Sequence, residues 1–213
     1  MSLTSPWNWA LRKVLVSATE GSGIPSFINV KNPVIIDYIE QQRKNLKLKI
    51  VQVVADKKDK LDRLVQLLSY LGAESTMIFC NQRDSVERIS EVLKDAGIDC
   101  AYFHGKLEQE DRERTLIRFR NGSIFCLAAT DLAARGLDIP DMKHVIHFEL
   151  PMRGEEFTHR NGRTARMEAE GTAYILSHQD DVLPAYIAPK PRVLDLPVGL
   201  KAPAPSSWVT VYI

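Results

Sequence analysis

Six short apolar runs, separated by helical patterns, constrain the fold of this chain more than any other feature of its sequence. The runs predict β-strands at 50–54, 76–80, 99–103, 124–128, 143–148 and 172–176. Between them, apolar residues recur at helical spacing over 57–71, 84–96 and 108–121, and a glycine follows each stretch. Strands that are apolar throughout are buried on both faces. The pattern therefore predicts an α/β fold of three layers, with a mostly parallel central sheet between two layers of helices.

The two ends of the chain differ from this alternating region. Residues 1–45 contain one strand-like run, Lys13–Val16, and a connection rich in glycine and proline, so they are too short for a domain of their own. From Pro189 onward five prolines predict an extended linker, which leads to a new β-rich run at Trp208–Ile213. We therefore expect one main domain over 46–188, preceded by a segment of another domain at 1–45 and followed by a linker at 189–213.

Composition narrows the class of protein. Hydrophobic residues make up 45% of the 213 residues and charged residues 26%, which is the mix of a soluble globular protein and not of a disordered or collagen-like chain. No apolar run approaches the ~18 residues of a membrane helix, and the N-terminus lacks the pattern of a signal peptide. We expect no membrane association. The net charge of +1 predicts no bulk attraction to polyanions.

The spacing of cysteines and histidines argues against a metal site. The three cysteines, Cys80, Cys100 and Cys126, are widely separated and form no C-x-x-C pair. Each lies in or beside an apolar run, which predicts buried thiols in a reducing, cytoplasmic protein. His144 and His147 are three residues apart on a predicted strand, so their side chains are expected on opposite faces of the sheet.

Polar and charged residues gather in two segments that suggest phosphate chemistry. The loop 129–138 brings a hydroxyl, carboxylates and a guanidinium to the carboxyl end of the preceding strand, where parallel sheets bind ligands. The segment 159–166 contains three arginines, and Arg163 and Arg166 share a face if this segment forms a helical turn. Two guanidinium groups on one face can clamp a phosphate. The plainer alternatives are a solvated surface turn and a basic helix end.

A third segment, 103–112, also predicts a phosphate contact. Its strand ends in His104-Gly105, and a helix begins a few residues later. The free N–H groups of a helix N-terminus attract phosphate, and Gln109 and Arg112 in the first helical turn are expected to point at the same space. The plainer alternative is an ordinary strand-to-helix turn, in which glycine is common.

Together these segments resemble the second RecA-like domain of DEAD-box RNA helicases, a family of superfamily 2. The resemblance runs from about Ser17 to about Ile187. The matching segments, in family order, are Ser17-Ala18-Thr19 for motif III, 76–83 for motif IV, His104 to Arg112 for the H-G-x-x-x-Q-x-x-R segment, 129–138 for motif V and 159–166 for motif VI. The histidine that starts motif VI, His159, is typical of DEAD-box proteins, whereas relatives in the superfamily often carry glutamine there.

The resemblance implies a role for each matching residue. The residues it assigns to ATP are the arginine fingers Arg163 and Arg166, His159, and Asp138 at the ribose with Gly136 beside it. The residues it assigns to the RNA backbone are Asn81, Gly105, Gln109, Arg112 and Thr130. The residues it assigns to coupling and to the organisation of motif V are Ser17, Thr19, Asp131 and Arg135. The implied cofactor is ATP with Mg²⁺, and backbone contacts imply RNA binding without sequence preference.

The chain also departs from the family pattern. Asn161 stands where the family usually has an apolar residue, Ala165 replaces a glycine, and Lys106 stands where an acid is common. Residues 1–213 contain no G-x-x-x-x-G-K-[ST] loop and no D-E-A-D sequence. We therefore expect the P-loop lysine and the Mg²⁺ ligands to come from a first RecA-like domain, and we expect these 213 residues alone to hydrolyse no ATP.

Other functions stay open at this point. One is a non-catalytic RNA-binding or regulatory module, and another is a superfamily 2 translocase that acts on DNA, against which His159 argues. The run 208–213 resembles the opening strand of the RNA-binding domain in DbpA-type bacterial members, although an ordinary linker tail fits it equally. The expected partners are RNA and the first RecA-like domain. The sequence assigns no oligomeric state.

Overall fold

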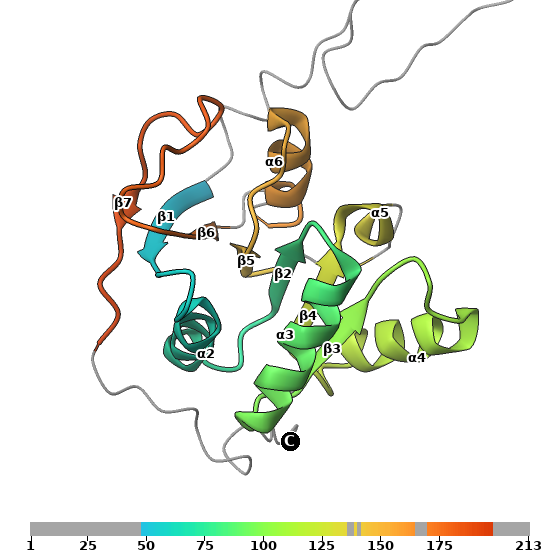
Figure 1. Ribbon diagram of the computed structural model, residues 1–213. Helices are drawn as coiled ribbons and strands as arrows, with labels where there is room; N and C mark the ends of the chain where they lie inside the picture. Colours follow the sequence, from blue (N-terminus) through green and yellow to red (C-terminus); the bar gives the residue numbers. More distant parts are fainter. Residues whose placement is uncertain (1–47, 136–138, 140–141, 165–169, 198–213) are drawn as a thin grey trace, which may run out of the picture. The chain divides into compact units, whose positions relative to one another are not determined.

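A computed structural model describes residues 48–135, 139, 142–164 and 170–197 (Figure 1). All of them belong to the compact unit Leu46–Ile213. The expected segments at 1–45 and 208–213 lie outside the described residues, so the predicted domain boundary near residue 45 and the motif III resemblance stay predictions.

The described residues build one parallel sheet of seven strands. In chain order the strands are β1 (Leu48–Val54), β2 (Thr76–Cys80), β3 (Cys100–Phe103), β4 (Cys126–Thr130), β5 (His144–His147), β6 (Gly171–Ser177) and β7 (Arg192–Val193). Their order across the sheet is β3-β4-β2-β5-β6-β1-β7, and every neighbouring pair is parallel. This arrangement confirms the predicted α/β class with its parallel central sheet.

Five helices connect the strands. They are α2 (Lys60–Leu71), α3 (Arg83–Asp95), α4 (Gln109–Arg120), α5 (Asp131–Ala134) and α6 (Gly154–Asn161). The longer helices begin and end close to the ranges that apolar spacing predicts. Gly72, Gly97 and Gly122, which follow α2, α3 and α4, have φ of 73°, 79° and 73°. Only glycine adopts this left-handed conformation without a steric penalty, so these glycines stop the helices as expected.

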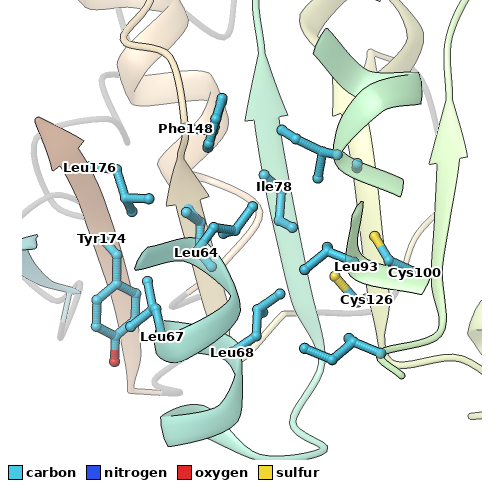
Figure 2. Packing of buried hydrophobic residues seen from close by; sticks show 14 of the residues in the cluster. Leu64, Leu67, Leu68, Ile78, Leu93, Cys100, Cys126, Phe148, Tyr174 and Leu176 are labelled. Carbon is cyan, nitrogen blue, oxygen red and sulfur yellow. The ribbon is translucent and has the colours of Figure 1, made fainter. Parts of the chain in front are cut away.

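Alternate residues along each strand face opposite layers of helices. On one side, Ile78 of β2 and Tyr174 of β6 pack against the leucines of α2 and the apolar stripe of α3 (Figure 2). Leu64, Leu67 and Leu68 of α2 point together at the sheet in that view. On the other side, Met77 and Phe79 of β2 pack with residues of α4 and α5. The period of two in the strands therefore fills two cores from one sheet.

The expected positions of the histidines and cysteines agree with the structure. His144 lies edge-on to Tyr174 on the α2 and α3 side, whereas His147 stacks on Phe157 of α6 on the opposite side. Cys80, Cys100 and Cys126 are free and buried, as predicted from their apolar surroundings; the cytoplasmic location inferred from them stays a prediction.

Two expectations about strands were wrong in detail. The strand predicted at 124–128 lies at Cys126–Thr130, because the N–H of Ile124 donates to the carbonyl of Arg118 at 3.2 Å and ties Ile124 to the turn after α4.

The domain does not end at 188. Arg192 and Val193 pair with β1, and Leu196 is buried. Proline favours extended backbone and is tolerated in edge strands, so this linker-like composition also suits the short edge strand β7.

Candidate functional site

Three loops meet at the carboxyl edge of the sheet, where β2, β4 and β5 end. The residues that follow these strands are Asn81, Asp131 and Glu149, and α6 lies close to them. In Figure 1, α5 and α6 lie near the arrowhead of β2. Because the strands are parallel, their carboxyl ends meet at one edge, which is where open α/β sheets bind ligands.

Arg160 of α6 joins the three loops. Its guanidinium donates to both carboxylate oxygens of Asp131, from Nε at 2.7 Å and from Nη2 at 2.6 Å. Nη2 also donates to Oδ1 of Asn81 at 2.8 Å, and Nη1 donates to the carbonyl of Glu149 at 2.5 Å. The guanidinium lies 5.1 Å from the ring centre of Phe79, and the side chain is 1% exposed. Arg160 is therefore a buried cation with its donors directed at protein acceptors, not at solvent.

The arginines of segment 159–166 do not share one role. α6 ends at Asn161, and Arg163 lies in the turn that follows it. The N–H of Thr164 donates to the carbonyl of Asn161 at 3.0 Å, which closes a turn around Gly162 and Arg163. Arg166 lies outside the described residues, so the expectation that Arg163 and Arg166 share a face stays a prediction.

A small hollow lies beside this turn. Its lining includes Arg163, His159 and Arg135, together with the carboxylates of Glu156 and Asp131. Arg163 is half-buried, and its Nη2 donates to the carbonyl of Ala134 at 2.7 Å. Arg135 is exposed, with Nη2 3.9 Å from Oε1 of Glu156. The structure thus brings four of the residues assigned to ATP or to motif V to one hollow: His159, Arg163, Arg135 and Asp131.

A buried polar pair lies below α6. Nε2 of His147 is 2.8 Å from Oδ1 of Asn161, and the imidazole stacks on Phe157 with ring centres 4.5 Å apart. Burial lowers the pKa of His147 to about 3, the Asn161 bond opposes this effect, and nearby Arg160 adds to it. His147 is therefore neutral at physiological pH. Because the amide oxygen accepts, Nε2 carries the proton and donates to Asn161.

Asn81 forms hydrogen bonds with the segment that follows β5. Its backbone N–H donates to Oε2 of Glu149 at 2.6 Å, and its Nδ2 donates to the carbonyl of Leu150 at 2.9 Å. The other carboxylate oxygen of Glu149 accepts from the hydroxyl of Ser85 in α3 at 2.8 Å. Asn81, assigned to RNA by resemblance, therefore also belongs to the network around Arg160.

The residues of the H-G-x-x-x-Q-x-x-R segment have partners within the domain. Arg112 lies over the ring of Phe103, with its guanidinium carbon 4.9 Å from the ring centre. Gln109 donates from Nε2 to Glu113 of the same helix at 2.7 Å. The expectation that the two side chains point at the same space stays a prediction. A Cβ built on Gly105 meets no atom within 4 Å, so packing does not require glycine at this position.

Several assigned residues lie outside the described part of the chain. They are Ser17, Thr19, Gly136, Asp138 and Arg166. Of the remainder, Thr130 is half-buried at the end of β4 and Asp131 begins α5. Sequence reasoning missed the roles of Arg160, Glu149 and His147. Only Asn161, the polar residue at a usually apolar position, signalled that a buried partner was needed.

Among the described residues, no helix is long and apolar enough to cross a membrane. The same residues contain no cluster of three or more His, Cys, Asp or Glu side chains arranged to hold a metal ion.

Comparison with known proteins decides the family. A model of the helicase conserved C-terminal domain matches residues 59–168, which is more than half of the chain. The chain belongs to this family. Its fold is that of the helicase C-terminal domain of DEAD-box RNA helicases.

Relatives of the domain are DEAD-box proteins from bacteria and eukaryotes. The chain is 36% identical to the ATP-dependent RNA helicase SrmB of Escherichia coli over 82% of its length and 40% of SrmB. It is 44% identical to E. coli DbpA over 54% of its length and 25% of DbpA. A crystal structure of E. coli SrmB bound to the regulator RraA superposes with a TM-score of 0.63 at 34% identity, covering 74% of this chain and 96% of that chain. This helicase domain therefore spans well under half of the curated relatives.

Removal of the buried cation tests the network around Arg160. Arg160→Met should lower the free energy of unfolding by about 3–5 kcal/mol, because it leaves the Asp131 carboxylate without its partner. The double change Arg160→Met with Asp131→Leu should cost less, since no charge is left unpaired. The control Arg135→Met alters an exposed arginine and should change stability by less than about 0.5 kcal/mol. Urea unfolding of the 213-residue chain measures all three. Equal losses for the single and double variants would contradict this account.

The low pKa of His147 predicts acid sensitivity. The unfolded chain binds a proton at this histidine below its ordinary pKa of about 6.5, whereas the folded protein does so only near 3, so stability falls as the pH drops between these values. From pH 7.5 to 5 the loss from this one group is about 2 kcal/mol. The free energy of unfolding should therefore fall less between pH 7.5 and pH 5 in His147→Phe than in the parent, and the difference should be about 2 kcal/mol. An identical pH dependence would show that His147 does not titrate in this way.

Proposed function

We propose that this helicase domain is the second core domain of an ATP-dependent RNA helicase, which supplies arginine fingers to ATP bound against a first RecA-like domain. The observation that carries the proposal is the hollow at the carboxyl edge, where Arg163, His159 and Arg135 lie together beside the buried Arg160–Asp131 pair. A fixed guanidinium at such an edge can stabilise the charge that develops on a transferred phosphoryl group.

The arginines that line the hollow are the residues we propose to meet the phosphates of a nucleoside triphosphate. Arg163 is half-buried, and its turn is closed by backbone hydrogen bonds. The backbone from which its side chain extends is therefore held in place. Asp138 and Gly136 are proposed at the ribose, and Arg166 as the second finger. As the family resemblance implies, Mg²⁺ would be held by carboxylates of the first domain together with the phosphates.

RNA binding is proposed on the neighbouring surface. Asn81 follows β2 and Thr130 ends β4 at the same edge, and Gly105 lies just beyond the end of β3, which pairs with β4. Backbone N–H groups and small side chains at this edge suit sugar-phosphate contacts, which carry no base information. Of the structural relatives, yeast Dbp5 was solved bound to RNA and ADP BeF3, with a TM-score of 0.59 at 28% identity.

The relatives favour RNA over the alternatives. SrmB, dbp3 and DbpA are named ATP-dependent RNA helicases, which supports an RNA substrate over DNA and catalysis by the complete protein over a purely regulatory module. A cytoplasmic location and a DbpA-type C-terminal RNA-binding domain remain parts of this proposal. SrmB matches a larger share of the chain than DbpA does.

A fusion protein tests the arginine finger. Residues 46–213 would replace the second domain of E. coli SrmB, and RNA-stimulated ATP hydrolysis would be measured. Arg163→Ala should lower turnover by about 10³-fold or more, while RNA binding without nucleotide stays within about twofold. Arg114→Ala, an exposed arginine paired with Glu110 on α4, is the matched control and should leave both unchanged. Equal loss of turnover and RNA binding would assign Arg163 to RNA or to folding.

Gly105 tests the RNA surface. Gly105→Val should weaken RNA binding by the fusion protein about tenfold, an effect of roughly 1.4 kcal/mol, because the added side chain obstructs the approaching backbone. Stability should not change, since no atom lies within 4 Å of a Cβ at this position. Gly154→Val is the contrast, because a Cβ there lies 2.9 Å from Cβ of Tyr186 and should destabilise the fold. RNA affinity unaffected by Gly105→Val would remove Gly105 from the site.

A further inference from the structure

The turn that carries Arg163 begins at Asn161. The carbonyl of Asn161 accepts from the N–H of Thr164 at 3.0 Å, and the N–H of Arg163 donates to the carbonyl of Arg160 at 3.1 Å. The carbonyl of Arg163 in turn accepts from the N–H of Met142 at 2.9 Å. A rotation of the Asn161 backbone would therefore move the base from which the Arg163 side chain reaches the hollow.

The side chain of Asn161 is anchored at one point below this turn. Its Oδ1 lies 2.8 Å from Nε2 of His147, which is fully buried at the end of β5. Phe157 and Phe79 stack on the imidazole, with ring centres 4.5 and 6.4 Å from it, and hold the plane of the ring. Within the described part of the chain, Nδ1 of His147 has no hydrogen-bond partner, so Nε2 makes the one polar contact of the ring.

We propose that His147 is a positioning residue for Arg163 and acts through its hydrogen bond to Asn161. This proposal rests on the proposed function of Arg163 as an arginine finger. β5 is held in the sheet on both sides, since both its neighbours pair with it along its length. The hydrogen bond ties the end of α6 to this strand, in addition to the backbone hydrogen bonds that close the following turn.

The energetics favour a directional role for this bond. A buried donor or acceptor without a partner costs about 1–3 kcal/mol, so Asn161 and His147 hold each other in one orientation. An apolar pair of similar volume would fill the same space without specifying the rotation of the turn. A displacement of about 1 Å at a reacting group can cost about 10²-fold in rate, so a small rotation here would matter for a guanidinium that stabilises a transition state.

Two substitutions at one position separate hydrogen bonding from packing. His147→Gln keeps an N–H donor at a similar distance from the backbone but loses the aromatic ring. His147→Phe keeps the ring and its stacking but loses the donor. If the hydrogen bond positions Arg163, the fusion protein with His147→Phe should lose about tenfold or more in kcat with little change in the KM for ATP, and the His147→Gln protein should retain kcat within about twofold.

The matched control is the other buried histidine of β5. His144→Gln removes a ring that contacts Glu74 at 2.6 Å, at the opposite end of the strand and on the other face of the sheet. It should cost stability without changing kcat. All variants are assayed at a temperature at which circular dichroism shows them folded, so a loss of folded protein cannot imitate a loss of kcat.

A second readout needs no catalysis. In the 213-residue chain, the side-chain Nε–H signal of Arg163 in a ¹H–¹⁵N NMR spectrum should shift or broaden in His147→Phe and stay near its parent position in His147→Gln and His144→Gln. Unchanged kcat and an unchanged Arg163 signal in folded His147→Phe would overturn the proposal. A parent fusion that shows no RNA-stimulated turnover, or whose turnover survives Arg163→Ala, would instead contradict the proposed function, so the two failures are distinguishable.

Discussion

The buried guanidinium of Arg160 is the interaction on which the rest of the candidate site depends. It bonds to both oxygens of Asp131, to Asn81 and to the carbonyl of Glu149, and so joins α6 to the loops after β2, β4 and β5. An unpaired cation at 1% exposure would be strongly destabilising, so the acceptors around Arg160 stabilise the folded domain and at the same time hold the loops at its carboxyl edge in place.

This arrangement explains how a nearly neutral domain can serve a polyanionic substrate. The net charge of +1 over 213 residues gives no bulk attraction to phosphate, and many surface arginines are paired, as Arg114 is with Glu110. The proposed function depends instead on a few cations at fixed places, above all Arg163 in its closed turn. In this proposal the neutral His147 below α6 helps to hold the turn of Arg163 in place. A group that carries no charge can be buried at low cost and still donate a directional hydrogen bond.

Much of the fold and part of the site could be predicted from the order of residues alone. Strands that are largely apolar indicate a sheet covered on both faces by helices, and glycines after helices can adopt positive φ, so class and most element boundaries followed from local patterns. The edge strand β7 was not predicted, because a proline-rich composition is found both in linkers and near edge strands. The sequence did not show that α6 ends at Asn161 and that Arg163 lies in the turn after it, because spacing alone does not show where a helix stops.

What the sequence determined by itself was therefore the α/β sheet, the helix ends marked by glycine, and the family resemblance of the loops that hold Arg163, His159 and Gly105. Only the tertiary structure decided which role each of several similar residues has. Arg160 and Arg163 differ by three positions, yet one is buried on Asp131 and the other lines the hollow. The reason is that burial, partner geometry and pKa depend on neighbours distant in the chain, such as Asn81 beside Arg160 and His147 beneath Asn161, and no local pattern encodes which of those neighbours will meet.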